Sequence, residues 1–162
     1  KNDYFEAILG QHAADCLLPG VVPLIEALRA AGIKVGVGSA SRNARWILDR
    51  LGLAALLDVI VDGLDIQRSK PAPDVFLHAA ARLAVVPEHC VVIEDAAAGI
   101  EAALAAGMWA VGVGPAARLP HAHARFDSLQ GVTLPAIIAA LENACERGDV
   151  LRKASQINEP LR

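Results

Sequence analysis

Three short stretches of the chain carry side chains that can handle a phosphate and a hard metal ion. Residues 38–43 read Gly-Ser-Ala-Ser-Arg-Asn, which brings hydroxyls and backbone N–H groups to the start of an expected helix, where a phosphate can bind. Lys70 precedes a Pro-Ala-Pro sequence that restricts the backbone, so its ammonium group can be fixed beside a phosphoryl group. Glu94 and Asp95 are adjacent carboxylates of the kind that suit Mg²⁺.

Each stretch also has a plainer interpretation when it is taken alone. Ser39 or Ser41 can be the N-cap of the following helix. Lys70 can be an ordinary surface charge. Asp95 can cap the next helix while Glu94 points into solvent. The choice depends on whether the fold brings the three stretches together.

The elements that must position these residues alternate between helix and strand. Short apolar runs predict strands, and apolar positions at helical spacing predict the helices between them. The expected strands are 33–38, 57–62, 90–94 and 109–113, and the expected helices are 3–16, 21–31, 42–51, 73–84, 97–106 and 133–146. Such an alternation requires right-handed crossovers, a parallel sheet and helices on both faces. The sequence therefore predicts a doubly wound α/β fold.

All three stretches lie in loops at the carboxyl ends of the expected strands. In an open parallel sheet, ligands bind beyond these ends. Ser39 follows the first strand, Lys70 lies in the loop after the second, and Glu94 ends the third. This common edge favours one phosphate and metal site over three unrelated roles.

Composition limits the possible functions. The chain has 162 residues and 54% hydrophobic content, enough for one domain with a real core. The net charge of −3, from 15 basic and 18 acidic residues, is spread along the chain and provides no basic stripe for nucleic acid or block for a membrane surface. The three cysteines form no CxxC pair, and no run of about 18 apolar residues is present. We expect a soluble, cytoplasmic protein with a small-molecule ligand.

The order of the three stretches resembles motifs two, three and four of the haloacid dehalogenase superfamily. The most specific wording is Lys70-Pro-Ala-Pro-Asp-Val-Phe and Glu94-Asp-Ala-Ala-Ala-Gly-Ile-Glu-Ala-Ala. Residues 1–141 are most similar to the β-phosphoglucomutase-like members, especially through the stretch at 38–43. The resemblance implies a three-layer, Rossmann-like fold.

The same resemblance implies a role for each site residue. Ser39 and the Ala40 amide would hold the transferring phosphoryl group, and Lys70 would balance its charge. Asp95 would ligate Mg²⁺, with Glu94 beside it. The second phosphate of a sugar substrate would be held by Ser41, Arg42 and Asn43.

The resemblance implies an enzyme that converts a β-hexose 1-phosphate into the 6-phosphate with Mg²⁺. Two alternatives stay open. One is a phosphatase of the same superfamily that hydrolyses a small phosphomonoester. The other is a non-catalytic relative that binds phosphate, which the intact motifs disfavour.

The superfamily's first motif, a strand that ends in Asp-x-Asp and supplies the nucleophile and the general acid and base, is absent from this chain. Asp62 and Asp65 are three positions apart and stand between motifs two and three, so we interpret them as loop residues. The missing strand would lie in the centre of the sheet, between the strands that end at Ser39 and Glu94. Either another segment fills this gap or the neighbouring strands close up.

The resemblance also implies a domain organisation. Residues 1–16 would end a helical cap and 17–146 would form the core. Residues 147–162 are polar with little apolar periodicity, so we expect them to form a mobile tail. Roughly 70 to 80 further residues would precede the chain, a cap and linker of typical small size. A complementing N-terminal segment is thus an expected partner, and the chain alone is expected to be inactive.

Two further patterns are weaker. Gly36-Val-Gly38 resembles the start of a dinucleotide-binding loop, but the third glycine and the ribose-binding acid are not in place. His121 and His123 resemble a metal-binding pair, but no other ligand stands near them in the sequence. We expect both histidines to lie in a solvated loop.

Overall fold

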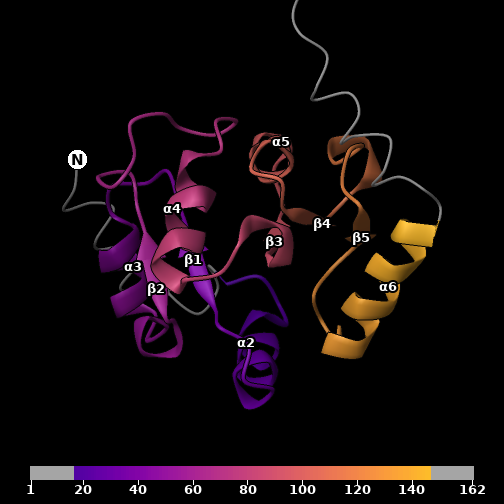
Figure 1. Cartoon of the computed structure of the whole chain (residues 1–162). Helices are drawn as coiled ribbons and strands as arrows, with labels where there is room; N and C mark the ends of the chain where they lie inside the picture. Colours follow the sequence, from indigo (N-terminus) through magenta and orange to yellow (C-terminus); the bar gives the residue numbers. More distant parts are fainter. Residues whose placement is uncertain (1–16, 147–162) are drawn as a thin grey trace, which may run out of the picture.

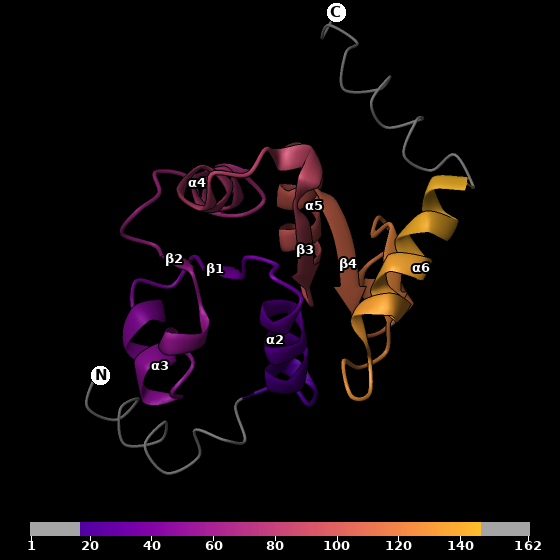
Figure 2. The ribbon, with the colours of Figure 1, turned by 60° about the horizontal axis from the view of Figure 1, so that its bottom comes forward.

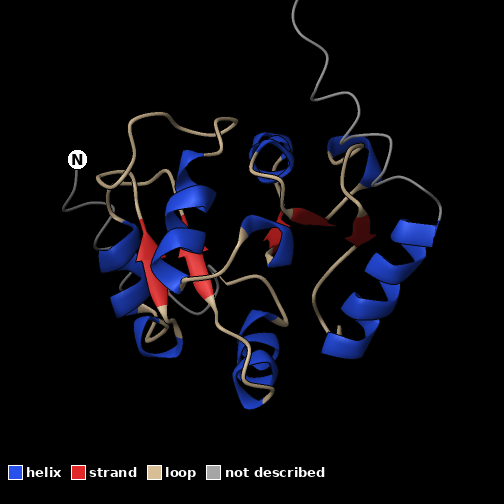
Figure 3. Cartoon of the chain, viewed as in Figure 1, coloured by secondary structure: helices blue, strands red, loops and turns tan. Residues whose placement is uncertain are grey.

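Parallel strands form two separate sheets in the computed structural model, which describes residues 17–146 (Figure 3). The first sheet pairs β1 (Gly36–Gly38) with β2 (Val59–Val61). The second sheet has the order β3 (Val91–Glu94), β4 (Trp109–Val113) and β5 (Ala124–Phe126). Every strand pair is parallel, so the predicted α/β class is confirmed.

Helices cover both faces of the strands, which gives three layers (Figures 1 and 2). Helices α4 and α5 lie together on one face, and α2 and α3 lie on the other, with α6 packed beside β5. The helices are α2 (Val21–Ala30), α3 (Ala44–Arg50), α4 (Asp74–Leu83), α5 (Ala97–Ala105) and α6 (Leu134–Glu146). None of them is long and apolar enough to cross a membrane.

Two buried clusters form the core. The first lies beneath α4 and α5 and joins residues of both sheets, including Val61 and Val92. The small side chains of α5, such as Ala102 and Ala103, are fully buried there, so this helix packs closely against β3 and β4. The second cluster lies on the opposite face of β4 and β5, against α2 and α6.

A cavity of about 760 Å³ separates the two sheets, and we call it the central slot. Its walls include Gly36–Gly38 of β1 on one side and Val91–Glu94 of β3 on the other. In residues 17–146, β1 pairs only with β2 and β3 only with β4. Neither outcome expected for the missing strand is therefore seen, because the gap is not filled by a described segment and its edges do not pair.

The observed element ends differ from the predicted ones in physically simple ways. The first strand starts at Gly36 rather than residue 33, because the Val35 N–H donates to the Asp58 carboxylate (2.7 Å) instead of a strand partner. The short strand β5 was not predicted, since its Ala-Arg-Phe sequence has a charge at its centre. The helices expected from 21 onward agree with the structure to within two residues at either end. The helix expected at 3–16 and the tail at 147–162 lie outside the described residues.

Candidate active site

The loop at residues 38–43 is held by its own serine hydroxyls. The Ser39 Oγ accepts the Ser41 N–H, and the Ser41 Oγ accepts the Asn43 N–H, each at 3.2 Å. Helix α3 begins only at Ala44, and no side chain caps it. The N-cap interpretation of the two serines is therefore wrong. Both hydroxyl protons stay available for an anion.

The loop that follows β2 is hydrogen-bonded to the loop at residues 38–43. The Gly63 N–H donates to the Ser41 carbonyl (3.1 Å), and the Ser39 N–H donates to the Val61 carbonyl (2.9 Å). A Cβ atom at position 63 would lie 2.3 Å from the Ala40 carbonyl oxygen, so only glycine fits there. The position of the serine loop thus depends on the loop that follows β2.

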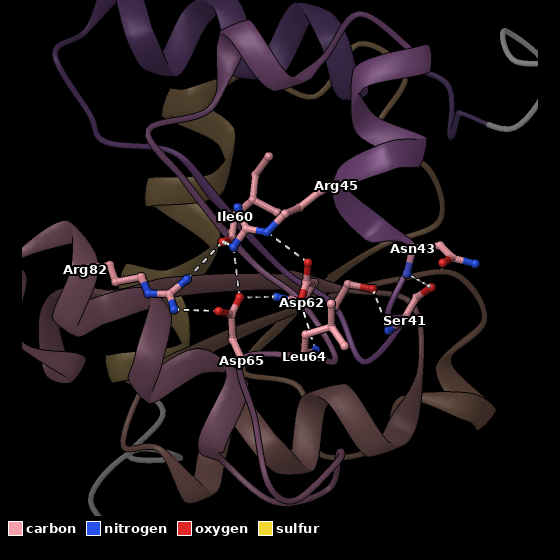
Figure 4. A network of polar contacts seen from close by, with 9 residues as sticks. Ser41, Asn43, Arg45, Ile60, Asp62, Leu64, Asp65 and Arg82 are labelled. Atoms are coloured by element: carbon pink, nitrogen blue, oxygen red, sulfur yellow. Dashed lines mark hydrogen bonds and ion pairs between the residues drawn. The ribbon is translucent and has the colours of Figure 1, made fainter.

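Asp62 anchors that supporting loop (Figure 4). It is 1% exposed, and its carboxylate accepts the Leu64 N–H (2.9 Å) and the Nε of Arg45 (2.9 Å). Arg45 belongs to the first turn of α3, directly after the serine loop. Asp62 is a loop residue, as predicted, but no sequence pattern indicated that it is buried and bound to Arg45 beside the serine loop.

Asp65 extends the network to α4 (Figure 4). Its carboxylate binds Arg45 (2.9 Å) and Arg82 (2.7 Å) and accepts the Asp62 N–H (3.0 Å). Both arginines also donate to the Ile60 carbonyl, at 2.6 and 3.2 Å. The hydrogen bond from Arg82, with those from the Asp62 N–H and Arg45, holds the pKa of Asp65 well below its ordinary value of 3.8.

This network makes the stability of the chain depend on acidity. A carboxyl whose pKa is lowered by folding stabilises the folded state above its unfolded pKa and loses that effect as the pH falls through the folded pKa. We expect the free energy of unfolding to fall as the pH is lowered from about 5 toward 2. Urea unfolding at several pH values measures this slope. The Asp65→Asn variant should show a shallower slope, and an unchanged slope would contradict the role of Asp65.

Lys70 is fixed by contacts on two sides. Its ammonium group forms an ion pair with Glu94 and lies 4.7 Å from the centre of the Phe76 ring. The surrounding loop is closed by Arg68, whose guanidinium binds the Asp74 carboxylate at 2.7 Å. This ion pair lowers the pKa of Asp74. The Lys70 side chain is only 17% exposed, so it is not an ordinary surface charge.

Glu94, rather than Asp95, binds the amides before α5. Its Oε2 accepts the N–H groups of Asp95 (3.1 Å) and Ala96 (3.3 Å), while its Oε1 binds Lys70. A Cβ at position 99 would lie 2.2 Å from the Glu94 carboxyl carbon, so Gly99 leaves the space for this side chain. Asp95 is exposed. The alternative in which Asp95 caps the helix and Glu94 lies in solvent is therefore wrong.

The Phe76 ring connects the end of β1 with Lys70 and Glu94. A Cβ at Gly38 would lie 3.1 Å from the Phe76 ring. The same ring contacts the Lys70 ammonium group, which forms an ion pair with Glu94. Gly38, Phe76 and Glu94 all line the slot. Lys70 thus lies beside Glu94, as the sequence predicted, whereas the position of Ser39 near the acidic pair stays a prediction. Arg42 and Asn43 are exposed, and their binding role stays a prediction.

The acidic pair has the chemistry of a magnesium site. Among residues 17–146 no three His, Cys, Asp or Glu side chains gather into a metal site. Asp95 offers an exposed carboxylate, whereas both oxygens of Glu94 already have partners. Mg²⁺ is commonly bound by one or two carboxylates, with water and substrate phosphate as the other ligands. The exposed carboxylate of Asp95 has the donor atoms that this chemistry requires, and its role as a ligand stays a prediction.

His123 is buried, whereas the sequence predicted a solvent-exposed position. It is 9% exposed, and its Nδ1 accepts the Ala110 N–H of β4 at 2.9 Å. Its ring also contacts that of Trp109, with 5.1 Å between centroids. The expectation of a solvated loop is thus wrong for His123, which is buried and contacts β4 through Ala110 and Trp109.

A family model for haloacid dehalogenase-like hydrolases matches residues 2–107, and the chain belongs to this family. Within it, the chain belongs to the β-phosphoglucomutase-like group. It is 46% identical over 114 residues to a β-phosphoglucomutase of Bacillus subtilis, a match that covers 70% of this chain and 50% of that enzyme. It is 44% identical over 96 residues to a fructose-1-phosphate phosphatase of Escherichia coli, covering 57% and 51%.

A solved structure supports the same assignment. The β-phosphoglucomutase of Clostridium difficile superposes with a TM-score of 0.82 at 34% identity, over 88% of this chain and 64% of that one. This similarity confirms the predicted Rossmann-like fold. The chain spans about half the length of the two curated relatives described above.

Proposed function

We propose that this chain, together with a segment that supplies a nucleophile, transfers a phosphoryl group on a small sugar phosphate in the presence of Mg²⁺. The preferred reaction is conversion of a β-hexose 1-phosphate into the 6-phosphate. The observation that supports the proposal is the ion pair of Lys70 with Glu94 beside Phe76, whose ring also lies next to Gly38, the residue before Ser39. Its similarity to β-phosphoglucomutases supports this choice of substrate.

The residues of this chain bind and neutralise the transferring group. The Ser39 hydroxyl and the Ala40 N–H donate hydrogen bonds to phosphoryl oxygens. Lys70 offsets the charge that develops on these oxygens, and its contacts with Glu94 and Phe76 keep it in place before substrate arrives. Asp95, with Glu94 beside it, would hold Mg²⁺, which would supply further charge neutralisation.

We infer that the attacking group comes from outside these 162 residues. The described loops at the carboxyl ends of β1, β2 and β3 contain a serine, a lysine and two carboxylates, but no Asp-x-Asp pair. We therefore propose an N-terminal segment as the partner that completes the site. Purified alone, the 162-residue chain should release no phosphate from β-glucose 1-phosphate with Mg²⁺. Measurable release would refute this division of labour.

The proposed reaction can be tested by complementation. The added protein is the part of the Bacillus subtilis β-phosphoglucomutase that this chain does not match. The complemented protein should form glucose 6-phosphate, detected with a coupled dehydrogenase. Formation of free phosphate alone would favour the phosphatase, a choice supported by the similarity to the fructose-1-phosphate phosphatase. Phosphate binding without either reaction would favour the non-catalytic relative.

Asn43 distinguishes the mutase from the phosphatase. Its exposed side chain follows the serine loop and is proposed to hold the second phosphate, together with Ser41 and Arg42. In the complemented enzyme, Asn43→Ala should raise the KM for the sugar phosphate about tenfold, as expected for one lost hydrogen bond to a charged group, and leave kcat nearly unchanged. An unchanged KM would argue for a phosphatase with a different substrate contact.

A further inference from the structure

We propose that Asp65 is a positioning residue, which holds the serine loop, residues 38–43, at a fixed place relative to Lys70. It acts through two arginines, Arg45 of α3 and Arg82 of α4. The inference rests on the proposed function, in which the serine loop and Lys70 bind the same phosphoryl group. Asp65 and its two arginines act on residues that bind phosphate rather than on the phosphate itself.

Asp65 connects two helices that cover opposite faces of the first sheet. α4 lies on one face and α3 on the other (Figure 2). Arg45, in the first turn of α3, contacts the Oδ2 of Asp65 (2.9 Å), and Arg82, in the last turn of α4, contacts the Oδ1 (2.7 Å). The two guanidinium groups approach the carboxylate from different sides (Figure 4). A single side chain thus fixes the start of α3 to the end of α4.

The two arginines also share a backbone acceptor at the edge of the sheet. Both donate to the Ile60 carbonyl of β2, at 2.6 and 3.2 Å. Within residues 17–146, β2 pairs only with β1, and the Val61 carbonyl accepts the Ser39 N–H on the β1 side. The Ile60 carbonyl therefore faces the outer edge, because successive carbonyls of a strand point to opposite sides. Each planar guanidinium is held at two or more points, which a lysine ammonium could not reproduce.

On the α3 side, these contacts lead to the serine loop. Arg45 follows the loop closely in the sequence, and its Nε also binds the buried carboxylate of Asp62 (2.9 Å). The next residue, Gly63, donates its N–H to the Ser41 carbonyl (3.1 Å). The serine loop is therefore attached to Arg45 along the chain and to the Asp62–Gly63 segment across it. A displacement of Arg45 would disturb both attachments together.

On the α4 side, the contacts lead to Lys70. Phe76 and Arg82 belong to the same helix, so the position of α4 fixes both. The centre of the Phe76 ring lies 4.7 Å from the Lys70 ammonium group. Asp65 thus stands between the two parts of the proposed phosphate site, and its two ion pairs set the separation of the serine loop from Lys70.

The plainer role for the two arginines is protection of the strand edge. Charged side chains at an edge strand prevent its pairing with other chains. Such protection requires neither a carboxylate shared between the two arginines nor the contact of Arg45 with Asp62. The two roles differ in whether a change at Arg82, on the far side of the sheet, affects the serine loop.

The test measures amide hydrogen exchange by NMR in variants of the 162-residue chain. Arg82→Met removes the α4 contact of Asp65 and leaves the Arg45–Asp62 ion pair in place. Exchange at the N–H groups of Ser41 and Gly63 should become about threefold faster, the effect of one partly exposed ion pair. Arg45→Met should speed it about tenfold, because a bond to a buried carboxylate is also lost.

Arg29→Met is the matched control. Arg29 also donates to a backbone carbonyl, that of Leu56 (3.0 Å), and contacts a carboxylate, that of Asp58 (3.5 Å). Its side chain is 39% exposed, against 40% for Arg82. These contacts lie before β2 begins, at the end of the strand away from the serine loop. Its replacement should leave exchange at Ser41 and Gly63 unchanged.

Kinetics of the complemented enzyme provide the second measurement. Arg82→Met and Arg45→Met should lower kcat about threefold and about tenfold, with KM nearly unchanged, because displaced binding groups affect the transition state more than the bound substrate. A purely structural loss would instead lower the folded fraction, which thermal unfolding measures. If Arg45→Met does not fold, Arg82→Met alone decides.

Unchanged exchange at Ser41 and Gly63 in Arg82→Met would overturn the inference in favour of edge protection. An equal change in Arg29→Met would also overturn it, as would faster exchange with an unchanged kcat in an active complemented enzyme. Faster exchange together with no turnover in the complemented parent protein would refute the proposed function and leave the positioning of the loop by Asp65 intact.

Discussion

Replacing Lys70 by methionine should lower kcat of the complemented enzyme about 10²- to 10³-fold, because it removes a fixed positive charge from the transferring phosphoryl group. Methionine keeps much of the apolar stem that packs beside Phe76. The expected loss is therefore mainly electrostatic. Steady-state kinetics with β-glucose 1-phosphate would measure it.

Arg50→Met is the matched control for this substitution. Arg50 also lies over an aromatic ring, that of Trp46 at 5.4 Å, but at the far end of α3 from the serine loop. Its replacement should leave kcat unchanged. If Lys70→Met raises KM and leaves kcat intact, Lys70 binds the ground state alone and the proposed role at the transferring group is wrong.

Replacing Asp62 by alanine should lower the free energy of unfolding by about 2–3 kcal/mol, because a buried carboxylate and its hydrogen bonds are lost together. The Leu64 N–H loses its acceptor and Arg45 loses one of its two carboxylate partners. For a chain of this size, the unfolding midpoint should fall by about 5–10 °C. Differential scanning calorimetry on the lone chain is sufficient.

Asp127 provides the comparison for Asp62. It also pairs with an arginine, Arg125, but its side chain is 88% exposed, against 2% for Asp62. Exposed ion pairs contribute little, so Asp127→Ala should change stability by less than about 1 kcal/mol. Equal effects of the two substitutions would mean that the burial of Asp62 does not matter for stability.

The alternation of strands and helices could be predicted from the sequence because it depends on local patterns. Apolar periodicity located α2 to α6 closely, and the strand-end rule predicted that Lys70 and Glu94 lie together, as their ion pair shows. The similarity of the chain to solved relatives confirms this architecture. These features required no knowledge of side-chain packing.

The features that were missed depend on contacts between distant residues. Asp62 resembled any loop aspartate, and only the fold reveals that α3 supplies its arginine partner. The roles of Glu94 and Asp95 could not be separated in the sequence, because the difference arises from the space above Gly99 and from the position of Lys70. Likewise, His123 is buried by its contacts with β4, which lies more than ten residues earlier.

The open edges of the central slot also affect how the chain would fare in a cell. Val91 and Ile138 expose apolar surface beside strand edges, a combination that favours aggregation and recognition by chaperones and proteases. Covering these edges should therefore slow both the aggregation and the proteolysis of the chain.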